Sequence, residues 1–98
     1  MRGFIEHETA QAALDDARQS GKWPRIDDAW EAVTWAISHE PDIGQPVTES
    51  GKVRSFVSDG ARSIGWPTIQ VIFDAGADVI VIYDAKFSDA KYDRAGQG

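Results

Sequence analysis

The stretch from Thr68 to Asp84 reads TIQVIFDAGADVIVIYD and decides the fold of this 98-residue chain. Its first part, residues 68–74, is apolar at alternate positions, which predicts a strand with one buried face. Its last part, residues 79–84, is apolar on both faces, as in a central strand that is covered on both sides. Ala75-Gly76-Ala77 lies between them and predicts a tight hairpin, because glycine accepts a positive φ.

The residues upstream of this hairpin predict one further strand and a long loop. Residues 52–58 alternate, with Val53, Ser55 and Val57 on one face. Residues 42–51 are rich in glycine and proline and predict a loop. The first few residues, 3–6, give a weaker strand signal that would add a fourth strand to the sheet.

Two helices are predicted before the strands. Residues 8–20 carry a narrow stripe at helical spacing that is mostly alanine, so this helix should lie close to its neighbour. Residues 26–39 carry a wider apolar stripe that includes Trp30. Trp23-Pro24 separates the two helices, and Pro41 ends the second one.

These elements follow the order α-α-β-β-β and predict an α+β domain. A two-helix hairpin should pack on one face of an antiparallel sheet of three strands, or four if residues 3–6 take part. The whole chain, 1–98, should form one domain, with 1–7 and 88–98 loosely ordered. The side chains predicted to be buried are Ile26, Trp30, Val33, Ile37, Phe56, Ile69, Val71, Phe73, Val79 and Val81.

The composition narrows the classes of function. The net charge is -6, and residues 1–50 hold ten acidic residues against four basic ones, whereas residues 51–98 hold six of each. An acidic domain is repelled by phosphate backbones, which disfavours nonspecific nucleic-acid binding. The chain has no cysteine, no leader-like apolar run at its start and no run that could span a bilayer. We therefore expect a cytoplasmic protein that makes no membrane contact.

The sequence shows no constellation typical of an active site or a metal site. His7 and His39 are the only histidines, and neither has a carboxylate or second histidine at metal-ligand spacing. No serine or cysteine nucleophile can be assigned a base. We therefore predict no metal and no cofactor, and rank an enzyme below a binding protein.

Residues 59–67 form the most unusual segment, because they join two strands through a connection that is long for a hairpin and contains Gly60 and Gly65. This loop either presents Arg62 and Trp66 to a partner or folds Trp66 back onto the core. Tryptophan and arginine are enriched at binding hot spots.

For Trp23 and Trp35, both a core position and an interface position stay open, because neither lies clearly on an apolar stripe. The basic residues Arg54, Lys86, Lys91 and Arg94, with Tyr92, could form a patch or be ordinary solvated groups.

Three features of the chain together resemble the RelE/ParE superfamily of bacterial type II toxins. The predicted second helix ends in Ile37-Ser38-His39-Glu40-Pro41-Asp42-Ile43-Gly44-Gln45-Pro46-Val47, which is similar to a helix-end segment common in that superfamily. A strand bearing an arginine follows, Val53-Arg54-Ser55, and then the hairpin of two apolar strands. The resemblance covers residues 10–87.

The resemblance implies a compact toxin that a cognate antitoxin neutralises. RelE-like members cut mRNA in the ribosome, and ParE-like members poison DNA gyrase. Arg54 matches a motif position, and Arg62 and Lys86 lie near suitable places, so these three are the catalytic candidates. Arg62, Trp66 and Arg54 are the candidates for partner binding. The chain departs from the family in its acidity and in an N-terminal strand that is short or missing.

Three functions are therefore kept. The first is a toxin-like protein that acts through protein binding and is held by an antitoxin. The second is an acidic, phage-type inhibitor of a nucleic-acid-handling enzyme, and the third is a ribosome-dependent mRNA endonuclease. The neighbouring genes would separate the first two readings, and homo-oligomerisation stays open.

Overall fold

The computed structural model describes residues 3–76 and 78–91. Within them, two α-helices and a short 3-10 helix accompany one five-stranded mixed sheet, so the α+β prediction is confirmed. The strands lie in the order β1-β5-β4-β3-β2 across the sheet. The elements are β1 (Phe4–Glu6), α1 (Glu8–Ser20), α2 (Ile26–His39), β2 (Gln45–Pro46), β3 (Val53–Ser58), η1 (Arg62–Ile64), β4 (Thr68–Asp74) and β5 (Ile80–Ser88).

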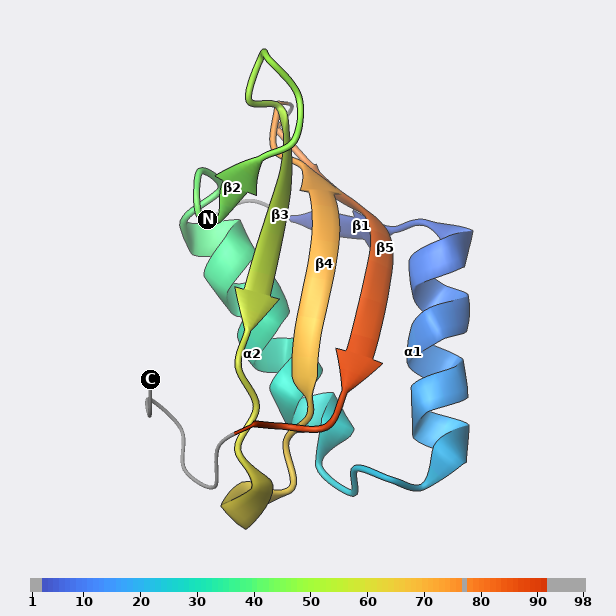
Figure 1. Ribbon diagram of the computed structural model, residues 1–98. Coiled ribbons are helices and arrows are strands. Elements are labelled where there is room, and N and C mark those ends of the chain that lie inside the picture. Colours follow the sequence, from blue (N-terminus) through green and yellow to red (C-terminus); the bar gives the residue numbers. More distant parts are fainter. Residues whose placement is uncertain (1–2, 77, 92–98) are drawn as a thin grey trace.

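The predicted antiparallel strands form the centre of the sheet (Figure 1). β4 pairs with β3 from Val53↔Asp74 to Ser58↔Ile69, and it pairs with β5 from Thr68↔Ser88 onward. β5 runs to Ser88, beyond the predicted end of this strand at residue 84. The extension follows the strand period, because Ala85 is buried and Phe87 half-buried, while Lys86 and Ser88 are exposed.

The prediction of which side chains at the start of β5 face the core is wrong. Ile80 and Ile82 are fully buried, whereas Val79 is 38% exposed and Val81 is half-buried. Both alternate sets of this run are apolar, so the pattern could not decide which set faces the core. The register also shifts between Ile72 and Phe73, where a bulge changes the phase of the pairing.

The two edge strands correct the purely antiparallel prediction. β1 pairs in parallel with the start of β5, from Phe4↔Ile80 to Glu6↔Ile82, and makes the sheet mixed. β2 pairs with β3 inside the segment that was predicted to be loop. β1 has exposed side chains at Phe4 and Ile5, so backbone pairing rather than an apolar pattern defines it. Such a strand leaves little signal in the sequence.

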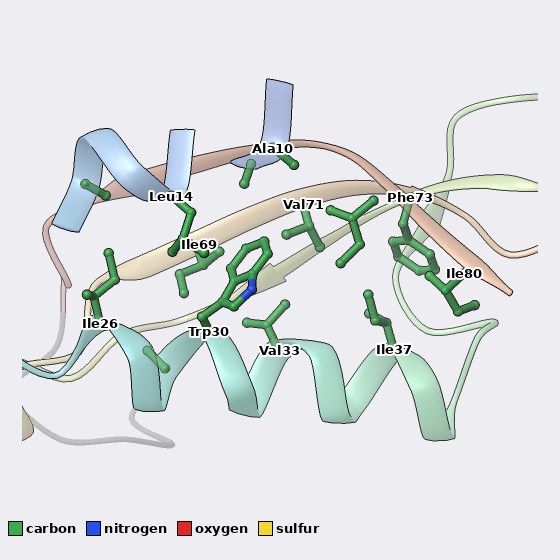
Figure 2. Packing of buried hydrophobic residues seen from close by; sticks show 14 residues of the cluster. Ala10, Leu14, Ile26, Trp30, Val33, Ile37, Ile69, Val71, Phe73 and Ile80 are labelled. Carbon is green, nitrogen blue, oxygen red and sulfur yellow. The ribbon is translucent and has the colours of Figure 1, made fainter. Parts of the chain in front are cut away.

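One hydrophobic cluster joins both helices to the sheet. α2 lies behind the sheet and α1 runs beside β5 (Figure 1). Side chains of α2 point toward those of the strands in Figure 2, with Trp30 between α2 and β4. The cluster contains Ala10, Leu14, Ala17, Ile26, Ala29, Trp30, Val33, Ile37, Ile69, Val71, Phe73, Ile80, Ile82 and Ala85. Fully burying each of the larger side chains contributes about 1.5–3 kcal/mol.

Polar contacts fix the ends of α1. The imidazole Nδ1 of His7 accepts a hydrogen bond from the backbone N–H of Thr9 at the start of the helix. Gly21 ends the helix with a φ of 69°. Arg18 then bonds Asp27 at 2.7 Å and so connects the last turn of α1 to the first turn of α2. The hydrogen bond that Arg18 donates to Asp27 raises the pKa of Arg18, although this exposed pair contributes little to stability.

Candidate partner-binding site

The loop at residues 59–67 is closed at its base by a pair of backbone hydrogen bonds. Ala61 N–H donates to Trp66 O, and Trp66 N–H donates to Ala61 O, each at 3.1 Å. The 3-10 turn η1 lies between them, and Gly65 follows it with a φ of 71°. The connection that is long for a hairpin thus contains a 3-10 turn, which the bridge between Ala61 and Trp66 closes.

Gly60 is needed at the base of this loop because the backbone passes close by. A Cβ placed on Gly60 would lie 2.4 Å from the carbonyl oxygen of Trp66 and from the carbonyl carbon of Pro67. The backbone N–H of Gly60 also donates to Thr68 Oγ1 at 3.0 Å. The loop is therefore held in one arrangement relative to the start of β4.

A pocket of about 260 Å³ forms where this loop meets two distant segments of the chain. We call it the loop pocket. Its polar and aromatic lining consists of Lys22 and Trp23 from the α1–α2 connection, Arg62 and Trp66 from the loop, and Asp89 from the segment after β5.

Two hydrogen bonds connect the walls of the loop pocket. Trp23 Nε1–H donates to Asp89 Oδ1 at 3.2 Å, and Arg62 Nη2 donates to the carbonyl of Lys91 at 3.0 Å. The structure thus brings the two predicted contact residues of the loop into one site.

For Trp66 the sequence left two positions open, contact with a partner and packing on the core, and the structure fits both. It is half-buried and packs against the hydrophobic cluster, and it also lines the loop pocket. Its indole Nε1 is buried and has no hydrogen-bond partner in the described part of the chain. A buried donor without an acceptor costs about 1–3 kcal/mol, so this side chain is held at some expense of stability.

Among the described residues, the lining of the loop pocket carries two cations and one carboxylate, although the protein is acidic. Lys22 and Arg62 line it against the single carboxylate among its lining residues, Asp89. Arg25 lies next to Gly65, where its charge is balanced by Asp28 at 2.7 Å. The ammonium of Lys22 lies 5.8 Å from the ring centre of Trp23. The pocket therefore offers aromatic surface and cationic donors to an anionic group.

Arg54 lies away from the loop pocket and hydrogen-bonds to backbone carbonyls of the segment before β3. Its guanidinium donates to the carbonyls of Ile43 at 3.1 Å, Gly44 at 3.1 Å and Gly51 at 3.4 Å. Arg54 stands near the start of β3, whereas the loop follows the end of that strand (Figure 1). We conclude that its position is explained by a structural role, and it does not contribute to the loop pocket.

Lys86 lies on a third surface. It pairs in register with Gln70 and lines a shallow hollow of about 120 Å³ with Ile72 and Asp84. The catalytic candidates Arg54, Arg62 and Lys86 thus line three different pockets. Tyr92 and Arg94, which the sequence grouped with Lys86, lie outside the described residues.

Sequence reasoning missed Lys22 and Asp89 as parts of the site. Neither belongs to a motif, and the distance between them along the chain leaves no local signal. Trp23 was one of two tryptophans left open between core and interface, and it is half-buried in the loop pocket. The other, Trp35, is 63% exposed and stacks on His39 at a ring separation of 3.9 Å.

The loop pocket brings cationic and aromatic side chains together. Across residues 3–76 and 78–91, no three histidine, cysteine, aspartate or glutamate side chains gather in a way that could hold a metal ion. Neither α1 nor α2 is long and apolar enough to cross a membrane. Comparison of the chain with models of protein families, with curated proteins and with solved structures finds no match.

Proposed function

We propose that this protein acts in the cytoplasm by binding a protein partner at the loop pocket, as a toxin-like protein held by an antitoxin. The observation that carries the proposal is the convergence of Arg62 and Trp66 with Lys22 and Trp23 in one pocket. Tryptophan and arginine are among the residue types that dominate binding energy when a pocket becomes desolvated.

Electrostatics favour an acidic partner at this place. The rest of the protein surface carries the excess negative charge, which repels an acidic segment elsewhere. The loop pocket is lined by two cations, Lys22 and Arg62, and by one carboxylate, Asp89. An antitoxin segment with a carboxylate would therefore be steered to the loop pocket and fixed in register there.

One interaction joins two of the features on which the resemblance to RelE/ParE toxins depends. The arginine of the matched strand, Arg54, donates to the carbonyls of Ile43 and Gly44, which belong to the matched helix-end segment. Two of the three features behind the resemblance thus form one structural unit. The short strand β1 also supplies an N-terminal strand, the element that the sequence left in doubt.

The acidic inhibitor is kept as a second candidate because the helices expose their carboxylates. Asp15, Asp27 and Asp28 are each more than half exposed at the side chain, although they pair with Arg18 or Arg25, and Glu8, Asp16 and Glu31 are also exposed on the helices. A basic partner would be drawn to these helices and not to the loop pocket. The mRNA endonuclease receives no such support, since its candidate residues line separate pockets.

A binding titration with the product of the adjacent gene tests the proposal. The change Arg62→Ala should weaken the complex by about tenfold or more, the loss typical of one hot-spot residue. Lys52→Ala is the matched control, because Lys52 is an exposed cation at the other end of the sheet. Circular dichroism checks the fold of both variants. Equal binding by wild type and Arg62→Ala would refute the proposal, and loss of binding on Asp15→Asn with Asp28→Asn would favour the acidic inhibitor.

A further inference from the structure

We infer that the partner binds through a short acidic and aliphatic segment that enters the loop pocket and continues into an adjoining groove. This inference rests on the proposed function. The groove, which we call the alanine groove, lies between α1 and β5 and has a volume of about 260 Å³. Its apolar lining consists of Ala13 and Ala17 from α1, Ala85 and Phe87 from β5, and Trp23.

The loop pocket and the alanine groove are continuous because they share two lining residues. Lys22 and Trp23 line both. The indole of Trp23 is fixed there from two sides, by its hydrogen bond to Asp89 and by a ring contact with Phe87 at 6.5 Å between centroids. A segment that contacts Trp23 in the loop pocket can therefore pass directly to the groove.

The alanine groove suits an aliphatic side chain. Ala13 is half-buried, and Ala17 and Ala85 are buried, so only methyl groups form much of its lining. Small residues on a helix leave a depression beside a strand, and a bound aliphatic group would remove this apolar surface from water. The alanine stripe of α1, which packs against β5, thus also creates the hollow.

The charged residues of the two hollows predict the orientation in which the partner segment binds. Two cations, Lys22 and Arg62, line the loop pocket with Asp89, and Asp89 already accepts a hydrogen bond from Trp23. The alanine groove contains Asp16, which does not line the loop pocket. Because Lys22 lines both hollows, Asp16 in the groove faces one cation, whereas Asp89 in the loop pocket faces two, so a carboxylate should prefer the loop pocket. The recognised segment should carry its acidic residue at the loop pocket and its aliphatic residue in the groove.

A phage-displayed library of fully degenerate short peptides, selected on the immobilised full-length protein, provides the probe. Enriched peptides should carry aspartate or glutamate close to leucine, isoleucine or valine in a constant order. The change Ala13→Leu fills the groove and should weaken the resynthesised peptides by about tenfold or more. Ala12→Leu is the matched control, since Ala12 is the exposed neighbour on α1, and it should leave their affinity within about twofold.

The charge arm of the experiment uses two exposed residues. Lys22→Glu should weaken the acidic peptides by about tenfold or more. In a second selection on Asp16→Lys, the constant order of acidic and aliphatic residues should disappear. Should Ala13→Leu fail to fold, as judged by circular dichroism, Asp16→Lys decides the role of the groove. An unchanged order of residues in that selection overturns the inference.

The outcomes separate this inference from the proposed function. No enrichment, or enrichment of peptides without acidic residues, overturns the inference. Peptides that lose affinity on Arg62→Ala but bind Ala13→Leu as tightly as wild type would leave the loop pocket as the binding site and refute the groove. Peptides insensitive to both changes, together with an adjacent gene product that binds Arg62→Ala normally, would refute both.

Discussion

The indole N–H of Trp30 donates a hydrogen bond of 3.1 Å to the carboxylate of Glu6, and this bond joins the middle of α2 to the edge strand β1. Trp30 is 6% exposed and packs among the hydrophobic residues of the cluster. Its only polar atom therefore meets an acceptor at the boundary of the core. The contact anchors the N-terminal strand from the helix side, while backbone bonds to β5 anchor it within the sheet.

Truncation of Trp30 should destabilise the protein strongly. We expect Trp30→Ala to lower the free energy of unfolding by about 3–5 kcal/mol, since it leaves a cavity between α2 and the sheet. Trp35→Ala is the matched control on the same helix and should change it by less than about 1 kcal/mol, because Trp35 is 63% exposed. Urea denaturation measures both. A loss of equal size for the two variants would contradict the assignment of Trp30 to the core.

Removal of the Glu6 carboxylate should leave the Trp30 N–H without its partner. Glu6→Ala should therefore cost about 1–3 kcal/mol of stability. Glu8→Ala serves as the control, because Glu8 is exposed at the start of α1. The difference between the two variants in thermal or urea unfolding checks this prediction. If Trp30→Phe removes the effect of Glu6→Ala in a double-mutant cycle, the hydrogen bond is its cause.

The unpartnered indole of Trp66 predicts an asymmetry between two substitutions. Trp66→Phe removes the buried N–H and keeps most of the ring, so stability should change by less than about 1 kcal/mol. Trp66→Ala also removes the packing against the cluster and should cost at least about 2 kcal/mol. Denaturant titration of the two variants supplies the comparison. A large loss for Trp66→Phe would mean that the indole N–H has an acceptor in solution.

Arg54 should matter for stability and not for partner binding. Its guanidinium satisfies three backbone carbonyls, so Arg54→Ala should lower the free energy of unfolding by about 2–3 kcal/mol. Lys86→Ala, on an exposed lysine of β5, should change it by less than about 0.5 kcal/mol. Calorimetric unfolding and partner titration test the two parts. Intact stability with lost binding would place Arg54 at the partner interface instead.

Purified protein should not cut naked RNA. Arg54, Arg62 and Lys86 line three different pockets, so we expect that they do not act together on one phosphodiester. Gel electrophoresis of a labelled RNA after incubation with the protein is the measurement, with a ribonuclease as positive control. Cleavage that disappears on Arg62→Ala or Lys86→Ala, with the fold unchanged, would show that these residues are catalytic.

The sequence alone indicated only part of the candidate site. The segment 59–67 stood out through its glycines, and Arg62 and Trp66 were named as contact residues. Lys22 and Asp89 were missed because they reach the loop pocket from other segments, and only the packing of those segments brings them there. Arg54 was a candidate because it matches a motif position of the resembled family. Its register with Phe73 turns it toward the helix-covered face, where it donates to the carbonyl of Ile43 in the segment before β3.

The sequence by itself determined the elements that have an apolar face. The spacing of Trp30, Val33 and Ile37 fixed α2, and the alternation of Val71 and Phe73 fixed β4, because the hydrophobic effect acts on each face locally. Tertiary structure decided the phase of β5, the parallel pairing of β1 and the assembly of the loop pocket. The β5 run is apolar on both faces and β1 is an exposed edge, so backbone hydrogen bonds and the position of α2, not side-chain pattern, selected their arrangement.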